Sequence, residues 1–417
     1  MKNVSIALLG CGTVGKGVVD LLAMNGPLIE EQLDTKINIK RVLIRDLNKY
    51  EQMEDLPDSI QFTTDFNDII DDDEIEIVVE VMGSADFAKD CIEQCFLRGK
   101  SVISANKDLI ADYGIPLLKL SQQHNVDFQF EASVAGGIPI VRPMYSSLNS
   151  NRIEEIIGIM NGTTNFILTK MIREQMNFED ALKLAQQLGY AERNPSADVE
   201  GLDACRKICI LASLAFGTHV YPDSVYTEGI TKITLQDVDF ADVWGGVIKL
   251  IGSVKKLENG QVHIMVCPMF VHRGSQLASV DDVFNGIMVR GDATGDVVFY
   301  GKGAGKLPTA SAVVADVVDA LKNGSKVHDS LFWQPAEPVE GMLTDPAPAA
   351  YYVRVAGIAP AVVEAIYGYG RVVDERYEGC AYFVERADEK ALAEAARKVE
   401  AVGGSVKLVL KRLPEEN

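Results

Sequence analysis

The sequence predicts an α/β protein of two or three domains, and three observations support this class. In the first third of the 417 residues, short apolar strands alternate with helical patterns, which is typical of a parallel sheet covered by helices. Residues 262–271 and 286–300 have the pattern of antiparallel strands with turn signals, which indicates an α+β second domain. Strands and helices alternate once more from residue 349 onward.

Composition and charge exclude several classes of partner. The formal net charge is −20 and the isoelectric point is about 4.7, which argues against nucleic acid or an anionic membrane. No apolar run approaches a membrane span, so we expect a cytoplasmic protein. The seven cysteines lack disulfide spacing. The pairs Cys91/Cys95 and Cys205/Cys209 leave a zinc site open, but buried small apolar side chains explain them better.

The first strand, residues 4–9, runs into a glycine turn and then into a helical pattern. The first glycine permits a tight turn, the second lets the backbone approach a pyrophosphate, and the third lets the helix pack on the strand. A strand before the motif and a helix after it make a merely structural turn the weaker alternative. We therefore expect a Rossmann-like NAD(P)-binding domain over residues 1–130. The residues expected at the phosphates are Gly10, Gly12, Thr13, Val14 and Gly15.

The second strand bears on the choice of cofactor. It is predicted at residues 37–44, after an extended loop from residue 25 to residue 35. Arg45 and Asp46 follow it, with Lys49 nearby. An acid at this position binds a ribose hydroxyl, whereas an arginine suits the 2′-phosphate of NADP. Both are present, so we expect NADP as the cofactor, with NAD tolerated.

Lys107 follows a later strand of the same domain. Strands are predicted at residues 76–82, 101–105 and 126–130. In open α/β sheets ligands bind outside the carboxyl ends of the strands, so Lys107 is expected near the nicotinamide crevice. Taken alone, a lysine after a strand is more often a solvated loop residue.

The second domain is predicted over residues 131–328 and begins with a glycine-rich segment. The carboxylate of Glu131 and the carbonyls of Val134, Gly136 and Ile138 can bind a hard or alkali cation through oxygen. These three residues alternate, so in an extended segment their carbonyls point to one side. A plain interdomain turn is the alternative.

Two further motifs of this domain precede helices. The stretch Asn161–Asn165 carries amides and hydroxyls suited to N-capping or to a ligand. A second glycine-rich loop around Gly305 offers backbone N–H groups to an anion or the cofactor. We expect the helix that follows this loop, residues 308–321, to pack back on the first domain.

Charged residues gather in the stretch from residue 189 to residue 212. Asp203 and Lys207 are four residues apart in a helical pattern, so they share one helix face. Glu192 and Asp198 lie on the loop that leads into this helix. Three carboxylates and one ammonium therefore meet in an otherwise apolar neighbourhood, which indicates a functional cluster. A surface ion pair is the plain alternative.

The C-terminal part begins with a proline-rich stretch, residues 329–348, which predicts a linker. Residues 349–417 then follow the order βαββαβ, which is ferredoxin-like and by itself indicates no function. The expected elements are a strand at 351–355, a helix at 360–367, strands at 372–377 and 381–385, a helix at 389–402 and a strand at 405–411.

Together these motifs resemble homoserine dehydrogenase over essentially the whole chain. Several independent motifs in the right order make the resemblance specific. It implies the reversible NAD(P)H-dependent reduction of L-aspartate 4-semialdehyde to L-homoserine, in threonine, methionine and isoleucine biosynthesis. The matching stretches are residues 10–15, 104–107, 131–139, 161–165, 189–192, 198–207 and 303–309.

The resemblance also implies roles for individual residues. Lys207 would be the catalytic proton donor, and Lys107 would lie at the cofactor and assist. The residues implied in substrate binding are Glu192, Asp198, Asp203 and Lys207. Those implied in cofactor binding, besides the first glycine turn and Arg45, are Lys107, Gly189 and Gly305. Those implied as sodium ligands are Glu131, Val134, Gly136 and Ile138. A homodimer or homotetramer is expected.

The C-terminal part resembles an ACT domain with one departure. Residues 357–361, Gly-Ile-Ala-Pro-Ala, stand where an acidic residue and a Pro-Gly turn are usual, so we expect weak or no response to L-threonine. Two other functions stay open. A phosphorylating aldehyde dehydrogenase needs a cysteine nucleophile with a histidine base, and none of the five histidines has an evident cysteine partner. A regulatory protein with an inactive Rossmann domain is disfavoured by the intact glycine motif and both lysines.

Overall fold

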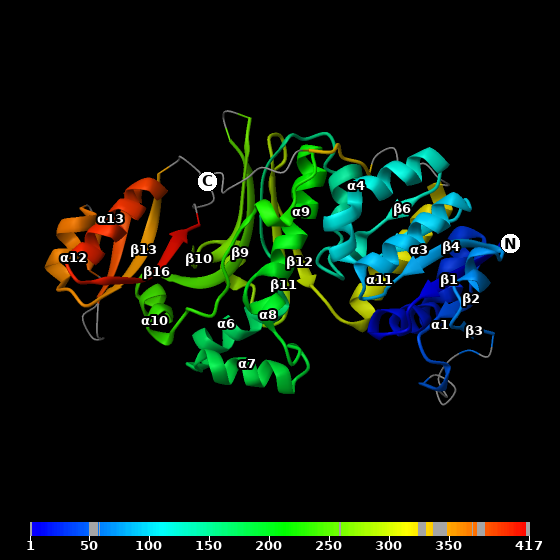
Figure 1. Cartoon of the computed structure of the whole chain (residues 1–417), viewed down its shortest axis with the longest axis horizontal. Helices are drawn as coiled ribbons and strands as arrows, with labels where there is room; N and C mark the ends of the chain where they lie inside the picture. Colours follow the sequence, from blue (N-terminus) through cyan, green and yellow to red (C-terminus); the bar gives the residue numbers. More distant parts are fainter. Residues whose placement is uncertain are drawn as a thin grey trace.

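The protein is arranged in three parts that lie side by side (Figure 1). The first domain contains the N-terminus, a mixed sheet with its helices occupies the middle, and the C-terminal part lies at the other side. No helix that can be described is long and apolar enough to cross a membrane. The computed structural model describes residues 2–49, 57, 59–257, 260–323, 331–336, 348–368, 370–372 and 380–413.

The first domain is built on a six-stranded parallel sheet with the strand order β3-β2-β1-β4-β5-β6. Apolar side chains of α1 and α11 cover one face, and those of α3 and α4 cover the other. This confirms the predicted α/β class. The strands are β1 (Lys2–Leu9), β2 (Thr35–Leu43), β3 (Gln61–Thr63), β4 (Ile75–Glu80), β5 (Ser101–Ser104) and β6 (Phe128–Gln129). The helices are α1 (Thr13–Leu33), η1 (Leu47–Lys49), α2 (Asn67–Ile70), α3 (Ala85–Leu97) and α4 (Lys107–His124).

The extended loop expected from residue 25 to residue 35 is wrong. Helix α1 continues to Leu33 and ends at Asp34, which has a left-handed backbone with φ 49°. Pro27 lies inside this helix, where its missing N–H and its ring oppose helical structure. Leu22 and Ile29 are seven residues apart and contact the same hydrophobic cluster, so continued burial of this face outweighs the local preference.

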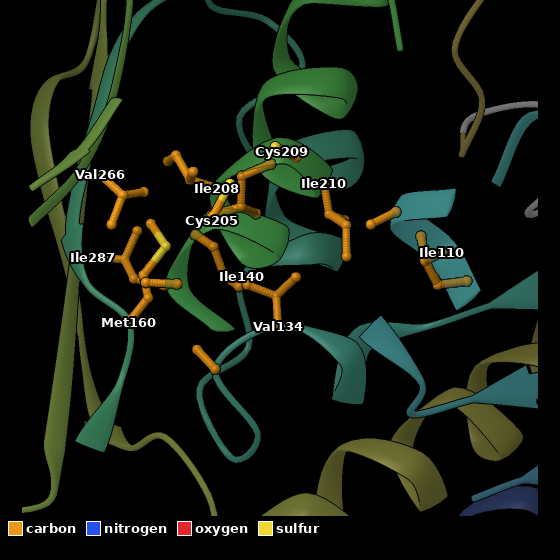
Figure 2. Packing of buried hydrophobic residues seen from close by; sticks show 14 of the residues in the cluster. Ile110, Val134, Ile140, Met160, Cys205, Ile208, Cys209, Ile210, Val266 and Ile287 are labelled. Atoms are coloured by element: carbon orange, nitrogen blue, oxygen red, sulfur yellow. The ribbon is translucent and has the colours of Figure 1, made fainter. Parts of the chain in front are cut away.

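The middle of the molecule is a mixed sheet with helices α6 and α9 against it. A hydrophobic cluster joins α9 to this sheet: Figure 2 shows Cys205, Ile208 and Cys209 of α9 beside Met160, Val266 and Ile287. The strands are β7 (Ile153–Ile159), β8 (Tyr226–Thr227), β9 (Gly246–Lys256), β10 (Val262–His272), β11 (Phe284–Gly291) and β12 (Gly295–Lys302). The helices are η2 (Glu131–Ser133), α5 (Val141–Ser146), α6 (Gly162–Glu174), α7 (Phe178–Gln187), α8 (Ser196–Val199), α9 (Leu202–Phe216), η3 (Pro222–Ser224), α10 (Leu235–Val243) and η4 (Gln276–Ser279).

Helix α11 (Lys306–Asn323) follows β12 and returns to the first domain, where it packs on α1. The packing is close, because a Cβ built on Gly17 of α1 would lie 2.4 Å from the carbonyl oxygen of Lys306. A glycine is therefore needed where the two helices meet.

The C-terminal part continues the middle sheet instead of forming a sheet of its own. Strand β16 pairs with β10 at two positions, so one ten-stranded sheet has the order β12-β11-β7-β9-β10-β16-β13-β15-β14, and its tenth strand, β8, also pairs with β10. The elements are β13 (Ala349–Ala356), α12 (Pro360–Tyr367), β14 (Gly370–Val372), β15 (Cys380–Ala387), α13 (Glu389–Ala401) and β16 (Ser405–Arg412), in the expected βαββαβ order. The strand expected at 372–377 lies, beyond Val372, outside the described residues.

The segment assigned above to a linker is anchored where it can be described. Leu331 is fully buried and Trp333 is 1 % exposed. Thr218 and Gln334 form an isolated parallel β-bridge. These residues therefore belong to the core between the domains.

Candidate active site

Two helices bring the predicted lysines together. Lys107 is the first residue of α4, and its backbone is held by Asn106, whose side chain caps the helix by accepting a hydrogen bond from the N–H of Leu109 at 3.2 Å. Helix α9 begins after Gly201, which has φ 84°, so Asp203 and Lys207 lie in its first two turns. Because α4 and α9 contact each other, residues of the two domains meet at one place.

Asp203 lies at the centre of this meeting point. Its Oδ2 atom is 2.6 Å from Nζ of Lys207, and its Oδ1 atom is 3.2 Å from Nζ of Lys107. Asp203 is only 8 % exposed, so water screens these contacts little. One carboxylate thus links a lysine of the first domain to a lysine of the second, which a surface ion pair does not do.

Asn161 completes the cluster. Its Nδ2 donates hydrogen bonds to Oδ2 of Asp203 at 2.9 Å and to Oδ1 of Asp198 at 2.7 Å. Lys207 donates a further bond to the carbonyl of Met160 at 2.8 Å. From the sequence, Asn161 was expected only to cap a helix or to bind a ligand. The signal for a place in the active site was a polar side chain just beyond the end of strand β7. Asn161 thereby holds the carboxylates of Asp198 and Asp203 in fixed positions relative to each other.

The pKa values of the two acids bound by Asn161, Asp203 and Asp198, are shifted in opposite directions. Burial raises the pKa of Asp203, but the charges of Lys207 and Lys107 lower it by more, so this pKa is far below its usual range. Burial raises the pKa of Asp198; the hydrogen bond from Asn161 offsets this only in part, and the charge of Asp203 adds to it. Burial lowers the pKa of Lys107, but Asp203 and Asp108 raise it by more. Asp203 and Lys107 therefore form a stable ion pair at neutral pH.

Glu192 does not join this cluster. It is exposed, and its backbone carbonyl accepts a hydrogen bond from the side chain of Gln186 at 3.0 Å. The loop that carries it is held near the start of α6, since Thr163 donates to the carbonyl of Tyr190 at 2.7 Å. Gly189, with φ 77°, begins this loop after α7. Glu192 and Gly189 thus lie beside the cluster, with the carboxylate of Glu192 open to a ligand.

The first glycine turn has the geometry of a phosphate site. Gly10 has φ 105°, and a Cβ on Gly15 would lie 2.4 Å from the carbonyl of Gly10, so both positions need glycine. A Cβ on Gly12 would meet no atom within 4 Å, which leaves open space at the start of α1. Gly12 is the N-cap and no side chain caps this helix. Free N–H groups of α1 therefore face that space.

A second loop approaches the same helix. Gly305 has φ 129° and precedes α11, and Lys306 forms an ion pair with Asp20 of α1. Gly303 lies against the glycine-rich segment, because a Cβ on Gly136 would be 2.5 Å from the carbonyl of Gly303. This loop therefore connects the predicted cofactor turn to the predicted cation segment.

Arg45 and Asp46 follow β2, as the cofactor prediction requires, and both are exposed. Asp46 accepts hydrogen bonds from the backbone N–H and the side chain of Asn48 at 3.0 and 3.1 Å. These bonds shape the turn after β2. Among the residues that the structure describes, none forms a hydrogen bond or ion pair that holds the Arg45 side chain away from a ligand at this edge of the sheet.

The segment after Glu131 is not extended, so that part of the cation prediction is wrong. Ala135 and Gly136 have φ values of 53° and 49°, and the N–H of Ile138 bonds to the carbonyl of Ala135. Both carboxylate oxygens of Glu131 accept hydrogen bonds from the N–H groups that begin α5, those of Ile140, Val141 and Arg142, at 2.6, 2.8 and 2.6 Å. The cation prediction therefore depends on carbonyls that a tight turn brings together, and not on the alternation of an extended segment.

Glu80, at the end of β4, had no role in the sequence reasoning. It is fully buried, accepts a hydrogen bond from the hydroxyl of Ser104 at 2.6 Å, and binds the N–H of Met82 at 2.7 Å. Burial raises its pKa to about 7. The carboxylate ties the end of β4 to the end of β5 and so supports the turn that carries Lys107. An acid at the end of a mostly apolar strand was the only signal.

Comparison with known proteins agrees with this geometry. Residues 10–131 match the family "Homoserine dehydrogenase, NAD binding domain", and residues 139–318 match "Homoserine dehydrogenase". The chain is 43% identical over 323 residues to homoserine dehydrogenase of Bacillus subtilis, covering 78% of this chain and 74% of that protein.

Solved structures extend the similarity to nearly the full length. The structure of a homoserine dehydrogenase from Thiobacillus denitrificans matches with a TM-score of 0.90 at 36% identity and covers 99% of both chains. A hyperthermophilic archaeal homoserine dehydrogenase in complex with NADPH matches at 26% identity with a TM-score of 0.65, over 76% of this chain and 97% of that one. The glycine turn, the paired lysines and these matches together show that the chain belongs to the homoserine dehydrogenase family of NAD(P)-dependent oxidoreductases.

Proposed function

We propose that this chain interconverts L-aspartate 4-semialdehyde and L-homoserine with Lys207 as the proton donor and acceptor. The observation that carries the proposal is the bridge of Asp203 between Lys107 and Lys207 beside the cofactor domain. When bound, the nicotinamide cofactor supplies or accepts the hydride. The protein's own task is to place the substrate and to manage the charge and proton on its oxygen.

Lys207 is suited to that task in the reductive direction. Negative charge develops on the aldehyde oxygen, and an ammonium group at that oxygen stabilises the charge and donates the proton. Nζ of Lys207 has two fixed acceptors, Oδ2 of Asp203 and the carbonyl of Met160, which leaves its third N–H for the substrate. Asp203 and Met160 thereby aim the proton. Lys107 holds the other oxygen of Asp203 and so keeps the carboxylate in this orientation.

The substrate's amino acid end needs carboxylates. An α-ammonium group is bound most strongly by acids that are not already paired. Asp203 already holds two lysines, so the acids left for the ammonium are Asp198, whose Oδ1 atom bonds Asn161, and the exposed Glu192. We assign ammonium binding chiefly to these two residues and assign to Asp203 the positioning of the lysines.

The decisive experiment is steady-state oxidation of L-homoserine by the purified protein with NADP and NAD side by side. We expect turnover with L-homoserine and little with L-serine, whose hydroxyl lies one methylene nearer to the ammonium. Loss of activity on alkylation of thiols would favour the aldehyde dehydrogenase alternative. The seven cysteines are buried, so we expect iodoacetamide to leave the native enzyme active.

The cofactor site is proposed to prefer NADP. The open space at Gly12 and the uncapped start of α1 suit a pyrophosphate, and Lys306, the residue after Gly305, contacts the same helix. Arg45 is placed to bind the 2′-phosphate, and Asp46 to bind a ribose hydroxyl when NAD is used. The archaeal relative described above was solved with NADPH, which supports the same class of cofactor here.

We expect Arg45→Ala to raise the KM for NADP about tenfold and to leave the KM for NAD within about twofold, because only NADP carries the 2′-phosphate. Arg98→Ala is a matched control. Arg98 follows α3 and is also exposed on the first domain, but it pairs with Asp71. Initial rates at saturating L-homoserine measure both constants. An equal rise for the two cofactors would show that Arg45 does not contact this phosphate.

A monovalent cation, sodium by resemblance, is proposed in the turn after Glu131. Val134, Gly136 and Ile138 are buried, and within the described part of the chain their carbonyl oxygens accept no hydrogen bond. Buried carbonyls without a donor are costly, and a cation satisfies several of them at once. Glu131, which is 3 % exposed, retains a free lone pair beyond its three N–H bonds.

We expect exhaustive removal of sodium and potassium to lower both kcat and the melting temperature, because this turn joins the two domains. Adding sodium chloride should restore both, whereas choline chloride at the same ionic strength should not. Unchanged kinetics and melting temperature after removal would mean that the segment is only a turn.

The remaining proposals concern assembly, location and regulation. Strand β12 is an edge strand of the large sheet and is only partly buried, which supports a homodimer or homotetramer in which a second copy covers it. Seven buried thiols suit the reducing cytoplasm. In the C-terminal part, Pro360 is the first residue of α12 and lacks a backbone N–H that an effector's carboxylate would need. We therefore propose weak or no response to L-threonine.

A further inference from the structure

The segment from Leu331 to Ala336 is a strap across the junction of the two domains. The N–H of Gln334 donates to the carbonyl of Gly217 at 2.9 Å, and the N–H of His219 donates to the carbonyl of Gln334 at 2.9 Å. These bonds fasten the strap to the backbone just after α9. They also direct Trp333 inward, where it is 1 % exposed. A linker needs no such burial of a large indole.

Trp333 contacts both domains. Its indole N–H donates to Nδ1 of His219 at 2.9 Å, and the two rings are nearly parallel, at 19°. Its ring meets that of Phe130 edge-on, with centroids 5.8 Å apart. On the first domain it fits against Gly114 of α4 so closely that a Cβ there would be 2.9 Å from Cζ2 of the indole. Trp333 therefore contacts three places: helix α4, the residue that follows β6, and the segment that follows α9.

His219 extends the connection back to α4. Nδ1 accepts the indole hydrogen bond, so the neutral ring carries its proton on Nε2. The ring also hydrogen-bonds the backbone of Ala111 in α4, and burial lowers the pKa of His219. Both ring nitrogens are thus engaged. His219 and Trp333 together bind the middle of α4 to the end of α9.

These two helices carry the lysines at their other ends. Gly114 is seven residues from Lys107, about 10 Å along α4, and Gly217 is ten residues from Lys207, about 15 Å along α9. Between them, Ile110 of α4 and Ile210 of α9 lie in one buried cluster (Figure 2). Close packing transmits a displacement at one end of such a pair to the other. The contact of Lys107 with Asp203 depends on where the two helices lie.

We infer that Trp333 is a positioning residue for the reaction: with His219 it sets α4 against α9 and so fixes Lys107 on Asp203, which in turn aims Lys207. This inference rests on the proposed function, because it assigns importance to that lysine–aspartate geometry. A purely structural anchor would contribute to folding stability and leave turnover per folded enzyme unchanged.

The test compares Trp333→Phe with Trp244→Phe in the full chain. Trp244, the other tryptophan, packs on Tyr352 and Phe383, which lie in strands β13 and β15 of the C-terminal part. We expect Trp333→Phe to lower kcat about 5- to 20-fold, with the KM for NADP within about twofold, because a small misplacement of catalytic groups costs turnover more than cofactor binding. Trp244→Phe should leave kcat within about twofold.

A second pair of variants tests the inference independently, in case Trp333→Phe does not fold. Gly114→Ala pushes only one methyl group against the indole, whereas Gly26→Ala adds the same methyl to helix α1 with no atom within 4 Å. We expect the first to lower kcat and the second not to. If wild type is active and both Trp333→Phe and Gly114→Ala keep its kcat, with or without a lower melting temperature, the inference is overturned. If wild type does not oxidise L-homoserine at all, the proposed function itself fails.

Discussion

Lys207→Ala should lower kcat for L-homoserine oxidation by about 10²- to 10⁴-fold, the usual contribution of a positioned general acid or base. The variant loses the group that Asp203 and the carbonyl of Met160 aim at the substrate oxygen. The dissociation constant for NADP should hardly change, because the dinucleotide turn lies on β1 and α1, away from α9. Steady-state kinetics and a cofactor titration measure the two quantities.

Two controls sharpen this result. Lys183→Ala removes an exposed lysine from α7 of the same domain and should leave activity unchanged. Lys207→Arg keeps the positive charge but replaces a group that can lose its proton with one that cannot at ordinary pH. It should therefore remain far below wild type. A Lys207→Ala enzyme that retains more than about a tenth of the activity would remove Lys207 from the role of proton donor.

Asp203→Asn should lower kcat/KM by about 10²-fold, because the variant loses the carboxylate that holds two lysines. The pH profile should change as well. In the wild type, Asp203 helps to raise the pKa of Lys107 against the opposite effect of burial. Without that charge, burial lowers this pKa, so Lys107 loses its proton at lower pH. The alkaline limb of kcat/KM is therefore expected to shift toward lower pH.

Asp180→Asn, on the exposed start of α7, is the matched control and should change neither rate nor pH profile. Asp198→Asn should raise the KM for L-homoserine more than it lowers kcat, since Asp198 is assigned to the substrate's ammonium group. If Asp203→Asn showed a lowered rate with an unmoved alkaline limb, Lys107 would not be the group that Asp203 controls.

Local patterns were sufficient for much of this site. The pairing of Asp203 with Lys207 follows from helical spacing, and the contact at 2.6 Å has that origin. The glycine turn is equally local, because the need for glycine at Gly10 and Gly15 arises within one strand–turn–helix unit. The α/β class and the family could be predicted for the same reason: they depend on the order of such units.

Several predictions failed where distant residues decide the outcome. Helix α1 runs past Gly26 and Pro27 because Ile29, which is partly buried, packs against a cluster that includes residues of α11, a helix distant in the sequence. The proline-rich stretch holds a core tryptophan because Gly114 leaves room for its ring. The turn after Glu131 is tight because the N–H groups of α5 capture its carboxylate.

Local sequence was enough for the dinucleotide turn, the acid–lysine pair on α9 and the order of elements, since each depends on neighbours within about two helical turns. The contact of Lys107 with Asp203, the bridge of Asn161 from Asp203 to Asp198 and the separation of Glu192 emerge only from the fold. These arrangements depend on side chains of separate elements. Their distances are set by how helices α4, α6 and α9 pack together, and packing is a property of the whole core.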